Sequence, residues 1–285
     1  MARHPRTLRL GLIGEGISES LSPQLQHAIA DQLEIRLSYA LLDHQHFHRA
    51  LEEAERRRLD GVNVTAPHKG AAARAARWRS ADVAALGVSN TLSRIHGGWV
   101  AQNSDLFALC RCLKPMLVGP GGGRRPVIIL GAGATTRTLL FALARLFEKS
   151  DPFTVETYER GGAGSRSLGL WLRGQSFPFI LRRPRWGEWA ARCEEAPLII
   201  SALPPLSERI YAPLLDALMT SRGLFFDLNY GQRARTTRAF MIRRCAYQDG
   251  LEMLVWQGLS SARSWSHRWA SFDRIFPYFA RESAD

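Results

Sequence analysis

The sequence predicts an α/β protein of two domains, the first of which is built on a mostly parallel sheet. Short apolar runs alternate with amphipathic helical segments, a pattern typical of helices packed on largely parallel strands. The chain has 285 residues, which is more than one hydrophobic core usually spans. Its most linker-like stretch, rich in glycine and proline, is Gly119–Pro126. A domain boundary is therefore expected near the middle of the chain.

Alternating strands and helices are expected in the first hundred residues. Short apolar runs predict strands at 8–13, 37–42 and 61–65. Ser22 and Pro23 are expected to open a helix, because serine is a good N-cap and proline suits the first helical position. A charged amphipathic helix is expected over 47–58.

A strand, a glycine turn and a helix follow the linker-like stretch. The strand is the apolar run Val127–Leu130, the turn is Gly131-Ala132-Gly133, and the helix is expected over 135–147. This order is the context of a dinucleotide-binding fingerprint, and it predicts a Rossmann-like domain. Because Thr136 stands at the third glycine position, an ordinary tight turn is the alternative interpretation. Further strands are expected at 153–158, 198–201 and 224–228.

The residues after strand 153–158 bear on which dinucleotide would bind. A carboxylate at this position accepts hydrogen bonds from ribose hydroxyls and repels a 2′-phosphate. Glu159 is a candidate for that role and slightly favours NAD over NADP. The neighbouring Arg160 argues the opposite, and a solvated turn before Gly161 is a third interpretation.

The charge and cysteine content exclude several classes of protein. Thirty-eight Lys and Arg residues against 26 Asp and Glu residues give a net charge of +12. The arginine clusters are scattered and not interleaved with aromatic residues, so a solvated surface is expected and a nucleic-acid partner is not. Four cysteines without zinc-knuckle or paired spacing indicate no disulfide scaffold. No window approaches the roughly 20 apolar residues that span a bilayer. We expect a reduced, cytoplasmic protein with no membrane partner.

Three alternating histidines raise the question of a metal site. His44, His46 and His48 have only Asp43 nearby as a further ligand. A polar loop that enters a helix is the better interpretation, and no metal is predicted.

The segment 61–69 holds the highest density of chemically capable side chains. Asn63, Thr65 and Lys69 follow one another at a predicted strand end, where they would read hydroxyl groups and move a proton. Lysine is rare in this chain, since the others are Lys114 and Lys149. The alternative for a single lysine is a solvated surface charge.

Five motifs, in order along the chain, resemble those of the shikimate/quinate dehydrogenase family. Residues 61–69 are similar to the family signature G-x-N-V-T-x-P-x-K, and residues 249–257 are similar to D-G-L-x-M-L-x-x-Q. The other three motifs are Ser20-Leu21-Ser22-Pro23, Leu86–Leu92 and Asn103-Ser104-Asp105. The Gly14–Ile17 opening and Glu19 look closer to the quinate/shikimate and aminoshikimate branches.

The resemblance implies an NAD(P)-dependent dehydrogenase acting on shikimate, quinate or a related cyclohexane carboxylate, of the kind used in aromatic amino acid biosynthesis. Its partner would be that small molecule, and its state a monomer or homodimer. Lys69 and Asp105 are the implied catalytic pair. The implied substrate contacts are Ser20, Ser22, Asn63, Thr65, Asn90, Tyr230 and Gln257. The implied cofactor contacts, to NAD or NADP, are Gly131, Ala132, Gly133, Ala134, Glu159, Arg160, Ala202, Gly250 and Met253.

The domains implied by the resemblance are a substrate domain over 1–112, to which 250–285 returns, and a cofactor domain over 113–249, with the active site in the cleft between them. The cofactor half departs from the family pattern. Residues 201–207 replace the usual N-A-T-P-x-G-M loop on the nicotinamide side, and Glu159-Arg160-Gly161 replaces N-R-T/S. These departures motivate an alternative function: a ligand-binding or regulatory relative that has lost hydride transfer.

Overall fold

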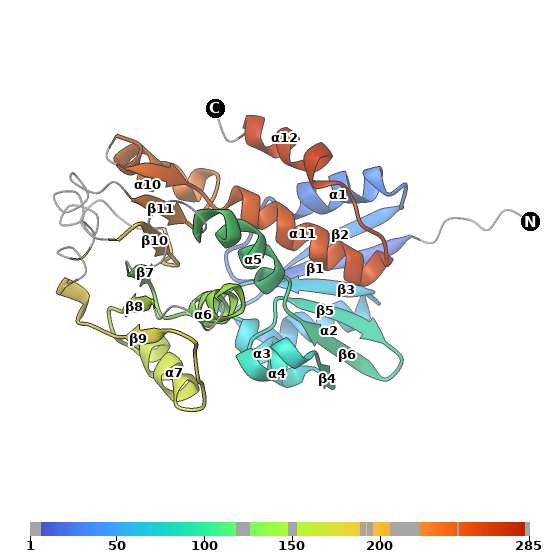
Figure 1. Ribbon diagram of the computed structural model, residues 1–285. Coiled ribbons are helices and arrows are strands. Elements are labelled where there is room, and N and C mark those ends of the chain that lie inside the picture. Colours follow the sequence, from blue (N-terminus) through green and yellow to red (C-terminus); the bar gives the residue numbers. More distant parts are fainter. Residues whose placement is uncertain are drawn as a thin grey trace, which may run out of the picture. The chain divides into compact units, whose positions relative to one another are not determined.

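The computed structural model describes residues 7–117, 126–147, 153–188, 192, 196–205, 223–243 and 245–282 (Figure 1). The chain divides into two compact units. Unit 1 comprises residues 1–108 and 254–281, and unit 2 comprises residues 109–253 and 282–285. The division falls within helices α5 (Ser104–Leu117) and α11 (Leu251–Ser266). Residues 119–125 of the predicted linker lie outside the described residues.

Unit 1 is built on a mixed six-stranded sheet in the order β2-β1-β3-β5-β6-β4. Three of its five neighbouring pairs are parallel, and the pairs β3–β5 and β5–β6 are antiparallel. Strands β5 and β6 form a hairpin with Gly97 in its turn and Gly98 at the start of β6, and both glycines have positive φ. The strands are β1 (Leu8–Gly14), β2 (Leu37–Asp43), β3 (Gly61–Val64), β4 (Trp78–Arg79), β5 (Thr91–Ile95) and β6 (Gly98–Gln102).

The helices of unit 1 correct one detail of the sequence prediction. Ser22 is the first helical residue of α1, and Leu21 occupies the N-cap position without a side-chain hydrogen bond. The hydroxyl of Ser20 instead accepts the backbone N–H of Ser22 at 3.3 Å. The helices are α1 (Ser22–Gln32), α2 (Phe47–Arg56), α3 (Lys69–Ala75), α4 (Ala81–Leu86) and α12 (Phe272–Glu282), with most of α11.

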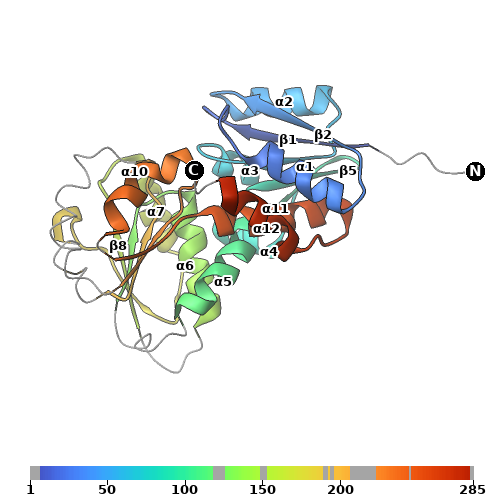
Figure 2. The ribbon, with the colours of Figure 1, turned by 90° about the horizontal axis from the view of Figure 1, so that it is seen from above.

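Helix α11 lies beside α1, so the C-terminal part of the chain completes the core of unit 1 (Figures 1 and 2). Gly258 permits this approach, because a Cβ there would lie 2.5 Å from Leu25 Cδ2. Gln26 Nε2 donates to the carbonyl of Gly258 and to Ser261 Oγ, each at 3.3 Å. Trp265 Nε1 donates to the carbonyl of Leu92 at 3.1 Å, which ties the same helix to the sheet.

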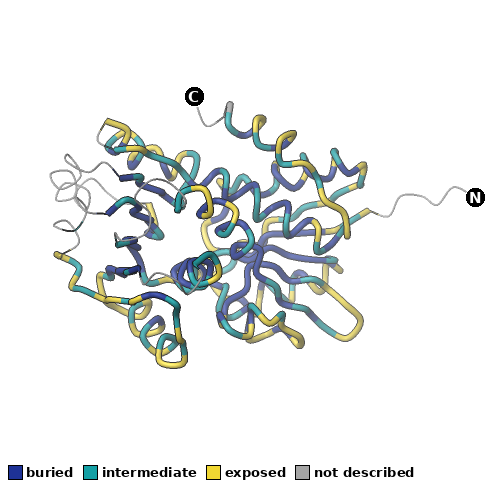
Figure 3. Tube along the Cα trace, in the orientation of Figure 1, coloured by how far each residue is buried: buried dark blue, intermediate teal, exposed yellow. Residues whose placement is uncertain are grey.

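Unit 2 is a Rossmann-like domain with an all-parallel sheet in the order β12-β11-β10-β7-β8-β9. The central strands are buried (Figure 3) and match the apolar runs of the sequence. Strand order reverses between β7 and β10, and this switch point is where open parallel sheets bind their ligands. The strands are β7 (Val127–Leu130), β8 (Thr154–Tyr158), β9 (Ile180–Arg182), β10 (Leu198–Ser201), β11 (Leu224–Asp227) and β12 (Ala246–Gln248). Its helices include α6 (Ala134–Leu146), α7 (Ala163–Leu172) and α10 (Gln232–Met241), with the short 3₁₀ helix Trp186–Glu188.

None of the helices in the described ranges is both long enough and apolar enough to span a bilayer.

Candidate active site

A buried lysine–carboxylate pair lies beyond the carboxyl end of β3. Lys69 is the first residue of α3, and its Nζ donates to Asp105 Oδ2 at 2.7 Å. The two side chains are 14% and 7% exposed, so water screens the pair little. Asn103 caps the start of α5, because its Oδ1 accepts the N–H of Leu106 at 3.1 Å. The cap fixes the turn of helix that carries Asp105.

Asn90 occupies the other oxygen of the Asp105 carboxylate. Its Nδ2 donates to Asp105 Oδ1 and to Ser104 Oγ, each at 2.8 Å. Its Oδ1 accepts the N–H of Ser104 at 2.7 Å and the hydroxyl of Thr91 at 3.1 Å. Both hydrogens of this amide are therefore committed to neighbouring side chains. The substrate contact implied for Asn90 stays a prediction, and the geometry adds a role in holding Asp105.

Asn63 differs from Asn90, because only the oxygen of its buried side-chain amide has a hydrogen-bond partner among the described residues. Its Oδ1 accepts the hydroxyl of Tyr39 at 3.0 Å, which fixes the orientation of the amide. Its Nδ2 is buried and has no hydrogen-bond partner among the described residues. A buried donor without a partner costs about 1–3 kcal/mol, so this group suits a hydroxyl or carbonyl oxygen of a ligand. Sequence reasoning missed Tyr39, because nothing local links it to Asn63.

The Ser20–Ser22 turn is held at the carboxyl end of β1. Both oxygens of the Asp43 carboxylate accept backbone N–H groups, from Gly16 at 2.9 Å and from Ile17 at 3.1 Å. A Cβ on Gly14 would overlap the side chains of Ile17 and Thr65, so the loop and the end of β3 pack closely. Because β1 and β3 are parallel neighbours, Thr65 and this turn lie at the same edge of the sheet as Asn63 and Lys69.

The remaining predicted substrate residues are divided between the units. Gln257 lies in the part of α11 that belongs to unit 1, where it is half-buried next to Gly258. Tyr230 follows β11 and belongs to unit 2.

The alternating histidines do not converge. His44 Nε2 contacts Glu53 Oε2 at 2.6 Å, and this hydrogen bond is the main reason that the pKa of Glu53 lies below its usual value. His68 Nε2 contacts the carbonyl of His44 at 2.7 Å. Within the described ranges, no three His, Cys, Asp or Glu side chains are grouped so that they could hold a metal ion.

The glycine turn of unit 2 leaves room at the start of α6. Gly131 has a φ of +123°, and a Cβ there would lie 3.0 Å from the carbonyl oxygen of Ala202. Gly133 is the N-cap of the 13-residue helix α6, and apart from its chain neighbours and the backbone of the helix itself no heavy atom of the described residues lies within 4 Å of the place its Cβ would take. Free N–H groups at a helix start attract phosphate. The turn Gly131-Ala132-Gly133-Ala134 thus fits the pyrophosphate of a dinucleotide.

Glu159 follows β8, where its side chain is paired with an arginine. Arg183 Nε donates to Glu159 Oε1 at 2.6 Å, and Arg183 Nη2 donates to the carbonyl of Ser165 at 3.3 Å. The hydrogen bond to Glu159 raises the pKa of Arg183. Arg160 is exposed, and its guanidinium lies 6.0 Å from the ring centroid of Trp186. Sequence reasoning missed Arg183, which is 24 residues further along the chain.

The predicted nicotinamide-side loop is described as far as Pro205. Ala202 N donates to the carbonyl of Leu130 at 2.8 Å, and the side chain of Leu203 packs into the core of unit 2. Leu206 and Ser207 lie outside the described residues. Gly250 has no room for a side chain, because a Cβ would overlap the carbonyl of Leu228, and Met253 is 8% exposed.

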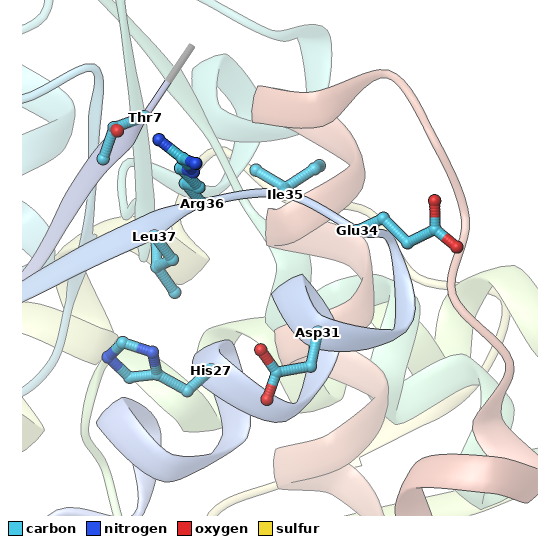
Figure 4. A pocket seen from close by; sticks show the side chains of 7 residues that line it. All are labelled: Thr7, His27, Asp31, Glu34, Ile35, Arg36 and Leu37. Atoms are coloured by element: carbon cyan, nitrogen blue, oxygen red, sulfur yellow. The ribbon is translucent and has the colours of Figure 1, made fainter. Parts of the chain in front are cut away.

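A hollow of about 660 Å³ lies elsewhere on unit 1, between the end of α1 and the start of β2 (Figure 4). It is at the amino end of β2, whereas Lys69 and Asn63 lie at the carboxyl ends of the parallel strands. None of the predicted site residues lines it. The lining residues are Thr7, His27, Asp31, Glu34, Ile35, Arg36 and Leu37.

A unit with a buried Lys–Asp pair and a Rossmann-like unit with an open glycine turn are the two parts expected of a two-domain α/β oxidoreductase. Comparison with known proteins narrows the class. Residues 12–92 match the family model of the shikimate dehydrogenase substrate binding domain. The shikimate dehydrogenase (NADP(+)) of Thermus thermophilus is 29% identical over 266 residues, which cover 91% of this chain and 92% of that protein. This chain is thus similar to shikimate dehydrogenases over most of its length, and residues 12–92 match the substrate-binding domain of that family.

Two solved structures illustrate the likeness. A shikimate 5-dehydrogenase of Thermus thermophilus, in complex with shikimate, has a TM-score of 0.74 at 25% identity, covering 98% of this chain and all of that one. The Listeria monocytogenes shikimate 5-dehydrogenase, in complex with shikimate and NAD, has a TM-score of 0.73 at 17% identity, covering 98% and 99%.

Proposed function

We propose that this protein interconverts a hydroxyl and a ketone on a shikimate- or quinate-type cyclohexane carboxylate, with NAD or NADP as cofactor. The observation that carries this proposal is the buried Lys69–Asp105 pair beside the unpartnered amide donor of Asn63. The pair supplies a proton carrier, and the Asn63 amide supplies a hydrogen-bond donor for a ring oxygen.

The proton is handled by Lys69. When the substrate is oxidised, its hydroxyl proton moves to Lys69 Nζ in the neutral amine form, and when the ketone is reduced, the Nζ ammonium gives a proton to the developing alkoxide. Asp105 orients Nζ through the 2.7 Å hydrogen bond, and Asn90 holds Asp105. A bound nicotinamide supplies the other half of the chemistry by accepting or delivering the hydride.

Substrate selection falls to polar groups at the edge of the sheet in unit 1. Ser20 and Ser22 bind the carboxylate, while Asn63, Thr65 and Gln257 read ring hydroxyls. Leaving a buried donor such as Asn63 Nδ2 unpaired is costly, so the site discriminates strongly against a ring that lacks the matching hydroxyl.

We further infer that NAD is favoured over NADP. A carboxylate that follows β8, as Glu159 does, would accept hydrogen bonds from ribose hydroxyls and repel a 2′-phosphate. Arg183 is hydrogen-bonded to Glu159. Arg160, the residue after Glu159, is exposed.

Purified protein, mixed with shikimate or quinate and with NAD⁺ or NADP⁺, tests the function. We expect reduced cofactor to accumulate with at least one ring acid, and faster with NAD⁺. The reverse reaction is assayed with 3-dehydroshikimate and NADH or NADPH. No turnover in either direction, with any pair of substrate and cofactor, would refute the enzyme proposal.

The loop after β10 favours a second candidate, a ligand-binding protein that has lost hydride transfer. Leu203 turns its side chain into the core, and prolines follow at 204 and 205, unlike the usual family loop. Calorimetry separates the two candidates. Tight shikimate binding with no binding of NAD⁺ or NADP⁺ supports this second candidate, and binding of either dinucleotide counts against it.

A further inference from the structure

Three segments of unit 2 meet at one residue, Asn229, which follows β11. Its Nδ2 donates to the carbonyl of Leu203 at 3.0 Å and to Asp227 Oδ1 at 2.8 Å. Its backbone carbonyl accepts the N–H of Gly250 at 2.8 Å. One residue thus connects the loop after β10, the end of β11 and the start of α11.

Asp227 fixes the direction in which the Asn229 amide points. This carboxyl group is completely buried, and burial raises its pKa. It also accepts the backbone N–H of Asn229 at 3.0 Å and the hydroxyl of Tyr247 at 3.4 Å. With one amide hydrogen bound to Asp227, the geometry of the planar group directs the other toward Leu203.

The contact to Leu203 matters because the following backbone has few other means of attachment. Pro204 and Pro205 carry no N–H group, so the backbone there can be held through carbonyl groups alone. Leu203 anchors the loop through its buried side chain, and Asn229 holds its carbonyl.

The loop lies at the switch point of the sheet. Ala202 donates its N–H to the carbonyl of Leu130 at 2.8 Å, and its own carbonyl fills the space beside Gly131. In such sheets the ligand binds at this crevice, outside the carboxyl ends of the strands. The path of residues 202–205 therefore borders the dinucleotide site.

We propose that Asn229 is a positioning residue for the nicotinamide end of the cofactor. It holds the loop 202–205 and the turn at Gly250 in the arrangement that receives the nicotinamide, which lowers the ordering cost of binding. This inference rests on the proposed function. Asn229 is not among the predicted site residues, and it fixes the loop in which this chain departs from the pattern of shikimate dehydrogenases.

Asn229→Leu tests the proposal, because leucine has a similar size and no hydrogen-bonding group. The full chain is titrated by calorimetry with NAD⁺ and with ADP-ribose, which lacks the nicotinamide ring. We expect the affinity for NAD⁺ to fall roughly tenfold, the equivalent of one well-placed hydrogen bond, and the affinity for ADP-ribose to change less than about twofold. Gln232→Leu, which removes an exposed amide three residues away, should change neither.

The two ligands together keep the result interpretable. Retained ADP-ribose binding shows that unit 2 of the variant is folded. Equal weakening of both ligands, or an unchanged affinity for NAD⁺, overturns the role of Asn229 while leaving the proposed function intact. Wild-type protein that binds neither NAD⁺, NADP⁺ nor ADP-ribose overturns the proposed function and this inference with it.

Discussion

At the scale of single residues, Lys69 is the group on which the chemistry depends. Lys69→Ala removes the proton carrier and leaves Asp105 without its ion-pair partner. We expect turnover to fall by roughly two to four orders of magnitude, the usual contribution of a general acid–base group, with a much smaller change in substrate affinity. Steady-state kinetics and calorimetry with shikimate measure the two effects. Lys114→Ala, an exposed lysine in α5, is the matched control, and near-normal turnover of Lys69→Ala would show that the proton moves elsewhere.

For Asn90, an experiment can distinguish between holding Asp105 in place and contacting the substrate. If it holds Asp105, Asn90→Ala leaves buried groups of Ser104 and Asp105 unpaired even without substrate. We expect the free energy of unfolding in urea to fall by about 2–3 kcal/mol. Ser93→Ala removes a half-buried hydroxyl with one 3.3 Å bond, and it should cost less than about 1 kcal/mol. A stable Asn90→Ala protein with impaired substrate binding would leave Asn90 as a substrate contact alone.

The sequence predicted the chemical groups of this site better than their connections. The signature at 61–69 named Asn63, Thr65 and Lys69, because local spacing places them at one strand end. The contacts of Tyr39 with Asn63, and of Arg183 with Glu159, join residues 24 positions apart. No local pattern encodes such contacts, since the sheet register brings the partners together.

At the scale of elements, the apolar content of a strand decided whether it could be predicted. Strands β7 and β10 have the predicted bounds, because each is a run of four buried residues. Strands β4, β9 and β12 were not predicted, since they are two or three residues long and none of them contains a buried residue. The hairpin β5–β6 was also missed, although Gly97 lies in its turn and Gly98 begins its second strand.

The packing of α11 on the sheet leaves no room for a side chain at Gly61, the first residue of β3. A Cβ at this position would overlap the indole ring of Trp265, whose Nε1 is bonded to Leu92. We expect Gly61→Ala to lower the free energy of unfolding by about 1–3 kcal/mol, the range for an overpacked core. In α3, Gly70→Ala meets only Arg74 Nη1 at 3.4 Å and should stabilise by about 0.5–1 kcal/mol. Equal effects of the two substitutions would contradict the close contact with Trp265.

At the scale of the whole molecule, unit 1 is discontinuous in sequence, and this makes its stability depend on the end of the chain. Residues 254–281 belong to the same compact unit as residues 1–108. Their contacts include the Gln26 hydrogen bonds to α11, the Trp265 bond to the sheet, and the bond from Arg268 Nη1 to the carbonyl of Leu33 at 2.7 Å. Unit 2 takes its sheet from one continuous stretch of chain.

A chain that ends at residue 250 tests this asymmetry. Without α11, Leu25 and the strand that contacts Trp265 lose their cover, so the amides of β1 and β3 should lose protection from hydrogen exchange. The amides of β7 and β10 should keep their protection, because the strands that flank them remain. A chain that ends at His267 retains the Gln26 and Trp265 contacts, and it should protect β1 and β3 far better. Full protection of β1 and β3 in the shorter chain would show that residues 1–108 form a stable unit alone, and that the C-terminal helices are an addition to it.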